Sequence, residues 1–235
     1  MKRVTIQLFA LVALAFTACQ KDQIVPGPGE NKVLINSDFS AGTDGWTGDF
    51  TDYDVQQESI MDFSFRHEAL PAPLNTSEKA LKISGSNRSD DMFMFVKRKV
   101  TGLKANTEYR LQFDLEIASQ YADNSVGIGG SPALAVYLKA GASATEPVKV
   151  KKGTYYDISI DKGNQSSGGK DAMLLGHVGA GDDVNQYKLI QRSNKEQPFT
   201  AKTNDKGELW VIIGTDSGFE GITTLYYNKI KVTAL

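Results

Sequence analysis

The chain has 235 residues, of which 40% are hydrophobic, and its formal net charge at pH 7 is -2. A chain of this length can bury a full core, and its nearly balanced charge gives no sign of the basic patch that nucleic-acid binding requires. It contains only two histidines, His67 and His177, and one cysteine, Cys19, which excludes a three-histidine zinc site and an internal disulfide.

Residues 1–18 have the pattern of a secretory signal peptide. Lys2 and Arg3 give a basic start, and an apolar stretch follows from Leu8 to Phe16. A membrane span requires roughly 20 apolar residues, so this shorter stretch predicts a cleaved signal and not a transmembrane helix. Removal of the signal makes the net charge two units more negative, because it carries two basic residues and no acid.

Cys19 follows the signal directly. Residues 16–19, Phe-Thr-Ala-Cys, resemble a bacterial lipobox, although Phe16 stands where leucine is usual. A lipidated N-terminus explains a lone cysteine in an exported chain. Residues 20–23, Gln-Lys-Asp-Gln, resemble the short tag that sends lipoproteins to the outer surface of some Gram-negative glycan-degrading bacteria. We therefore expect an outer-membrane lipoprotein that contacts the membrane only through its lipid and faces the periplasm or, preferentially, the cell surface.

Residues 24–30, Ile-Val-Pro-Gly-Pro-Gly-Glu, alternate proline and glycine and cannot hold a helix or a central strand. Together with the lipidated cysteine they predict a flexible tether over residues 19–30. Residues 31–235 are then predicted to form a single domain.

Within this domain, apolar residues recur every second position, which predicts strands. The segment Tyr109–Ile117 alternates five apolar side chains with Arg110, Gln112, Asp114 and Glu116. Shorter alternations occur within 61–65, 134–138 and 156–160. Leu209–Ile213 is apolar at every position, which predicts a strand buried on both faces.

Glycine-rich segments separate these strands, notably residues 127–132 and 161–170. Residues 214–221 are predicted to be a tight crossing between two strands. For Asp216 and Glu220 the favoured interpretation is that they shape this turn, and the alternative is a pair of catalytic carboxylates. Many short strands joined by such turns predict an all-β antiparallel sandwich.

Three segments in order carry a resemblance to the galactose-binding-like jelly-roll modules: Asn36–Trp46, Val100–Tyr109 and Leu225–Val232. The likeness covers about residues 31–117 and 208–232 and leaves about 120–205 unmatched. It implies a two-sheet antiparallel jelly-roll β-sandwich that often binds carbohydrate. It also implies a structural calcium ion bridging the first and last strands. Here that ion would lie near Asp38 and Asn228, where family members often carry aspartate in place of Asn228, and a lost carboxylate weakens calcium binding.

Sugar binding requires an aromatic face beneath the pyranose ring and planar polar side chains around it. If the strands that contain them are neighbours in one sheet, the side chains that could form such a groove are Arg110, Gln112, Asp114, Tyr137 and Lys139. The alternative is an ordinary solvated face. Trp210 could join the groove, because it has the opposite parity to Leu209, although tryptophan in an apolar strand is more often a core residue, as we expect for Trp46.

Arg88 lies in the polar segment 87–91, Asn-Arg-Ser-Asp-Asp, where it could bind an anion or hydroxyl groups. The alternative is a turn in which Asn and Asp side chains bond to their own backbone.

An enzyme alternative rests on residues 137–141, Tyr-Leu-Lys-Ala-Gly, which resemble the Tyr-Phe-Lys-Ala-Gly strand of jelly-roll alginate lyases. Residues 88–90 are distantly similar to the Arg-Ser-Glu of that family. Lyase chemistry requires a positive group beside the uronate carboxyl and a base near neutral pKa. The family's Gln-x-His motif is missing, the second arginine of its first motif is missing, and His177 follows the tyrosine motif instead of preceding it.

The leading hypothesis is a non-catalytic glycan-binding lipoprotein of the cell envelope. The alternatives are a polysaccharide-lyase-like enzyme and a structural lipoprotein that binds another protein, which an exposed apolar patch would support.

Overall fold

The structure, a computed structural model, describes residues 31–89 and 91–235. The predicted signal peptide, the lipidation site Cys19 and the tether fall on residues 1–30, outside the described residues. The described chain is built from antiparallel strands, and its one helix is a short 3-10 helix, η1 (Val55–Ile60). In this part of the protein, no helix has the length and hydropathy to cross a bilayer. The predicted all-β class is confirmed.

Two large sheets and one small sheet make up the fold. The seven-stranded sheet has the order β12-β7-β15-β5-β4, with β1 paired to β15 and β13 paired to β7. Its strands are β1 (Lys32–Ser37), β4 (Ser64–Ala69), β5 (Lys79–Ser86), β7 (Glu108–Ser119), β12 (Lys188–Ser193), β13 (Phe199–Lys202) and β15 (Ile222–Ala234).

The five-stranded sheet has the order β11-β8-β14-β6-β2. Its strands are β2 (Thr47–Thr51), β6 (Met92–Val100), β8 (Val136–Ser143), β11 (Ala172–His177) and β14 (Leu209–Ser217). A small sheet of order β3-β10-β9 consists of β3 (Tyr53–Asp54), β9 (Lys149–Lys152) and β10 (Tyr155–Ile158).

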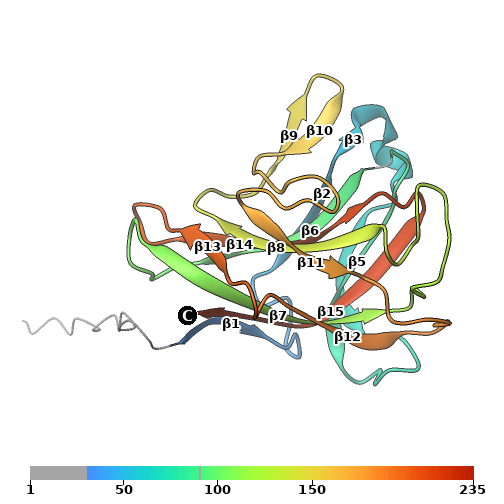
Figure 1. The fold of residues 1–235 in the computed structure, drawn as a ribbon, viewed down its shortest axis with the longest axis horizontal. Coiled ribbons are helices and arrows are strands. Elements are labelled where there is room, and N and C mark those ends of the chain that lie inside the picture. The colour runs from blue at the N-terminus through green and yellow to red at the C-terminus, as the bar shows by residue number, and fades with distance from the viewer. Residues whose placement is uncertain (1–30, 90) are drawn as a thin grey trace, which may run out of the picture.

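The chain crosses repeatedly between the two large sheets, for example at β5 to β6, β6 to β7, β7 to β8 and β14 to β15, which is the connectivity of a two-sheet jelly roll. Figure 1 shows the two layers, with β7 and β15 in one and β8 and β14 in the other. Alternate side chains from both layers fill the space between them, for example Phe113 of β7 and Leu138 of β8. Trp46 is 1% exposed and belongs to this core, as predicted, and its indole N–H donates to Ser37 Oγ at 3.0 Å.

Residues 144–171, the covering segment, lie against the outer face of the five-stranded sheet. In Figure 1 its strands β9 and β10 stand beyond that sheet, on the side away from the seven-stranded sheet. Ile158 and Ile160 form a second apolar cluster with Phe93, Phe95 and Ile212, whose side chains leave the outer face. This explains why β6 and β14 are apolar at successive positions, because the main core covers one face and the covering segment the other.

The crossing predicted at residues 214–221 is shorter than expected, because β14 continues to Ser217. Asp216 is therefore a strand residue with 0% exposure and not a turn residue. A buried aspartate requires positive partners in place of water. The covering segment and β8 supply those partners.

Candidate functional site

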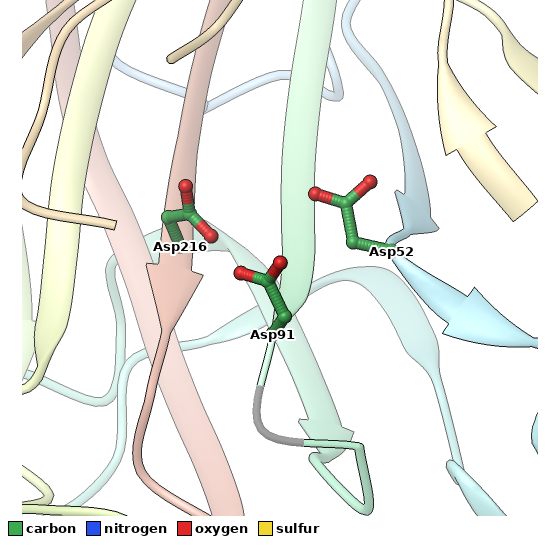
Figure 2. A group of neighbouring side chains, drawn as sticks. All are labelled: Asp52, Asp91 and Asp216. Carbon is green, nitrogen blue, oxygen red and sulfur yellow. The ribbon is translucent and has the colours of Figure 1, made fainter. Parts of the chain in front are cut away.

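A cluster of buried charged side chains lies between the five-stranded sheet and the covering segment. Asp216 comes from β14 and Lys139 from β8, while Lys162 is contributed by the covering segment. Asp52 directly follows β2, and Asp91 directly precedes β6. Figure 2 shows the carboxyl groups of Asp52, Asp91 and Asp216 directed toward a common region.

Two lysine ammonium groups pair with this cluster. Lys162 Nζ lies 2.7 Å from Asp216 Oδ2 and 2.8 Å from Asp52 Oδ2, and Lys139 Nζ lies 2.9 Å from Asp216 Oδ2. Lys139 also donates to the carbonyls of Lys162 and Ser167, at 2.9 Å each. The ion pairs therefore fasten the covering segment to the sheet.

Each aspartate keeps one buried oxygen, Oδ1, that has no hydrogen-bond partner. One oxygen from each of the three carboxylates lies within 4.8 Å of the others, close enough for the three to hold a metal ion together. The ammonium groups already supply positive charge on the Oδ2 side of Asp52 and Asp216. A metal ion would therefore have to bind through the Oδ1 atoms beside two lysines.

The surroundings shift the pKa values of these groups. Burial, together with the negative charge of Asp216, raises the pKa of Asp91 to about 7. Burial also raises the pKa of Asp52, against the opposing charge of Lys162. Burial lowers the pKa of Lys139, while for Lys162 the charges of Asp216 and Asp52 outweigh burial and raise the pKa. Lys139 and Lys162 form ion pairs with Asp216 and Asp52, and neither forms one with Asp91.

Stability should therefore depend on pH through Asp91. Its folded-state pKa of about 7 lies above the ordinary value of 3.8, so the stability from holding this proton is fully present below pH 3.8 and is lost as the pH rises through about 7. We expect Asp91→Asn to raise Tm more at about pH 8 than at about pH 5. Asp205→Asn, at an exposed turn, is the control. Equal Tm differences at both pH values would contradict the assignment.

A cavity of about 530 Å³ opens against Asp52 and Asp91, with Tyr155 and Asn164 also in its wall. A carboxyl group of near-neutral pKa beside a cavity has the properties of a general acid or base. Structural ion-pair networks shift pKa values in the same way. The buried contacts of Lys162 with both Asp52 and Asp216 account for this cluster as a structural network.

The groove predicted from Arg110, Gln112, Asp114, Tyr137 and Lys139 is not formed. The first three residues lie on β7 in the seven-stranded sheet, whereas Tyr137 and Lys139 lie on β8 in the five-stranded sheet. The condition for the groove, that these strands are neighbours in one sheet, is not met, because the chain crosses to the other layer between them. The polar side chains on the outer side of β7 instead bond to one another and to β12. Asp114 accepts hydrogen bonds from Gln112 of the same strand and from Ser193 of β12.

Lys139 is 1% exposed, so it cannot meet a ligand at the surface. Its parity places it on the outer face as expected, but the covering segment buries that part of the face. Tyr137 is half-buried and lies beside His177 of β11 in the strand register. Arg88 is exposed in a turn that Asn87 organises, because Asn87 Oδ1 accepts the Ser89 N–H at 3.1 Å. This matches the alternative of a turn bonded to its own backbone.

Trp210 lies on the part of the same outer face that remains open. It is half-buried, and its cross-strand neighbours are Lys99 of β6 and Ser143 of β8. The ammonium groups of Lys97 and Lys99 lie 5.6 and 5.3 Å from the centre of the indole ring. An open groove of about 500 Å³, the Trp210 groove, is lined by Asp44, Gly45, Thr47, Arg98, Lys99, Glu146 and Trp210.

The two side chains predicted to hold calcium, Asp38 and Asn228, each form hydrogen bonds within the protein. Asp38 is exposed, and its Oδ1 accepts the N–H and the hydroxyl of Ser40. The amide nitrogen of Asn228 donates to Glu116 at 2.7 Å. Among the described residues, the group of acids close enough to hold a metal is Asp52, Asp91 and Asp216, which the sequence did not bring together.

No protein-family model matches the chain, and no curated protein matches it. Solved structures resemble it at low sequence identity. A mannan-recognising carbohydrate-binding module is 9% identical with a TM-score of 0.40, and the match covers 88% of this chain and 99% of that one. The family 11 carbohydrate-binding module of Clostridium thermocellum is 11% identical with a TM-score of 0.39, over 86% and 94%.

A further carbohydrate-binding module of the β-sandwich superfamily is 11% identical with a TM-score of 0.39, covering 79% of this chain. The chain spans 56% of that structure's length. All three TM-scores are below 0.5. The assignment of a two-sheet jelly roll therefore rests on the strand order and pairing of the chain itself.

Proposed function

We propose that this protein binds a glycan in the Trp210 groove. The observation that carries the proposal is the half-buried indole of Trp210, which stands on an open sheet face among side chains that can bond hydroxyl groups. An indole offers a large rigid apolar face to the C–H surface of a pyranose ring. Asp44, Arg98 and Glu146 supply carboxylate and guanidinium partners around it.

Lys99 controls access to the indole ring. Its side chain is 40% exposed and lies 3.4 Å from Glu208, whereas Lys97 is held at 2.7 Å by both Glu146 and the carbonyl of Pro147. An exposed ion pair of this kind is worth only about 0–1 kcal/mol. A sugar ring can therefore displace Lys99 from the indole at little cost, while Lys97 stays in place beside the indole.

The test is calorimetric titration of the protein with a panel of neutral and uronate-containing oligosaccharides, with ultraviolet absorbance followed in parallel. We expect heat of binding without new absorbance. Growth of absorbance from unsaturated products would instead support the lyase alternative, against which the burial of Lys139 argues.

If neither heat of binding nor new absorbance were detected, the proposal would change to protein binding. One observation favours that second candidate, because two apolar side chains of the loop before β8 are unusually exposed, Val126 at 92% and Ile128 at 72%. Exposed apolar patches mark protein contacts.

We propose further that lipidation of Cys19 anchors the protein to the outer membrane and that residues 20–30 hold the domain at the cell surface. The lipobox-like residues before Cys19 support this. We expect Cys19→Ser to move the protein from the membrane fraction to the soluble fraction, measured by fractionation and immunoblotting. Retention of the variant in the membrane fraction would overturn the proposed anchor.

A further inference from the structure

A second cavity, of about 610 Å³, lies at the same end of the five-stranded sheet as the Trp210 groove. Its lining combines the end of β8 and the strand β13 with residues 170–171 and parts of the loops that precede β7 and β14. Its wall contains no aromatic side chain and is rich in groups that bond hydroxyls: Asn106, Glu108, Ser143, Thr145, Lys170, Asp171, Thr200, Lys202, Thr203 and Asn204.

Residues that line the two hollows are neighbours in two places. Ser143 and Thr145 line the second cavity, Ser143 is also the strand partner of Trp210, and Glu146 lines the Trp210 groove. On the other side, Glu208 lies 3.4 Å from Lys99 of the groove and accepts a hydrogen bond from Asn204 of the cavity at 3.1 Å. A ligand that extends from the indole toward β8 would therefore reach residues that line the second cavity.

The distance between the far ends of the two hollows limits the size of the ligand. Thr47 on β2 lines the groove, and Asp171, directly before β11, lines the cavity. Between β2 and β11 lie four strand spacings, which amount to about 19 Å at ~4.8 Å each. A single sugar ring cannot contact both ends.

The charges along this path cancel. In the groove, Arg98 is paired with Asp44, Lys97 with Glu146 and Lys99 with Glu208. The cavity wall carries two acids, Glu108 and Asp171, and two bases, Lys170 and Lys202. A polymer of uronic acids would meet no excess of positive charge along it.

We infer that the ligand is a neutral linear oligosaccharide that stacks on Trp210 and continues into the second cavity, where its hydroxyl groups bond to Glu108, Lys202 and their neighbours. This inference rests on the proposed glycan binding at Trp210. It adds the length and the charge class of the ligand.

The experiment compares disaccharides and hexasaccharides of the cello-, xylo- and manno- series, with oligogalacturonates as the charged probe, by calorimetry on the protein. For the series that binds, we expect the hexasaccharide to bind about 5- to 30-fold more tightly than the disaccharide, since one or two added hydrogen bonds at about 1 kcal/mol each give that factor. Glu108→Ala combined with Lys202→Ala should remove this gain. Both residues are exposed strand positions, so the variant should fold.

Lys195→Ala combined with Glu196→Ala, in the exposed turn before β13, makes the same charge change and should keep the gain. Equal affinity for both lengths, an unchanged gain in the Glu108→Ala/Lys202→Ala variant, or tighter binding of oligogalacturonate would overturn the inference while leaving glycan binding intact. Absence of binding at every length and charge would overturn the proposed function and this inference with it.

Discussion

Replacement of Lys162 with methionine should lower the free energy of unfolding by about 3–5 kcal/mol, because it leaves buried carboxylates without their ammonium partner. Lys162 is 5% exposed and is the lysine that contacts both Asp52 and Asp216. Asp216 would keep Lys139, but Asp52 would lose its ion pair with Lys162. The measurement is urea unfolding followed by circular dichroism.

Lys152→Met is the matched control, since Lys152 pairs with Asp157 but its side chain is 65% exposed, and its loss should cost less than about 1 kcal/mol.

The Lys162→Met variant also tests the cluster as a cation site. Without the ammonium group, Asp52, Asp91 and Asp216 face one another with only Lys139 nearby, and added calcium should raise the Tm of the variant more than that of the native protein. A variant as stable as the native protein would show that the ion pairs do not hold the covering segment.

The second large effect is expected at Trp210. Trp210→Ala should weaken glycan binding by at least about thirty-fold, or roughly 2 kcal/mol, because the indole is the aromatic anchor of the groove. Its half-buried position on the outer face predicts a smaller effect on folding than on binding. The measurement is calorimetric titration with the oligosaccharide that the panel identifies, together with a Tm determination.

Lys99→Ala and Trp210→Phe provide controls for this prediction. Lys99→Ala should leave binding unchanged or slightly improved, because it uncovers the ring, and Trp210→Phe should retain part of the affinity through its smaller aromatic face. If Trp210→Ala bound as tightly as the native protein, the glycan site would have to lie elsewhere on the molecule.

The buried cluster and the Trp210 groove occupy different parts of one sheet face. At one end of β14, Trp210 is open to solvent, while Ile212 and Asp216, at the same parity, are covered by residues 144–171. The ion pairs of Lys139 and Lys162 hold this cover in place. The covering segment therefore sets the extent of the face that is left for a ligand.

Local patterns in the sequence determined the fold class. The two-residue period of Tyr109–Ile117 depends only on the pleat of a strand, so it could be read without tertiary information. The burial of Leu209 and of residues 211–213, and the outward parity of Trp210, followed from the same rule, although Trp210 itself is not covered. The turn around Arg88 followed from side chains that bond to their own backbone.

Only the tertiary structure decided which strands are neighbours and which outward side chains are covered. Parity states that Arg110 and Tyr137 leave the core, but not that the chain changes sheets between them. It likewise places Lys139 outward, but its burial depends on a segment far along the chain, 159–171, that carries Lys162. Asp216 was expected in a turn, and only the structure shows that β14 includes it and that Lys162 pairs with it. The sequence did contain one signal for the buried cluster, a charged residue pointing outward on a strand whose other outward residues are apolar. Apolar outward residues indicate a covered face, and a charge on a covered face requires a partner of opposite charge. Asp52, Asp91 and Lys162 lie in loops, where no periodicity relates residues that meet in space.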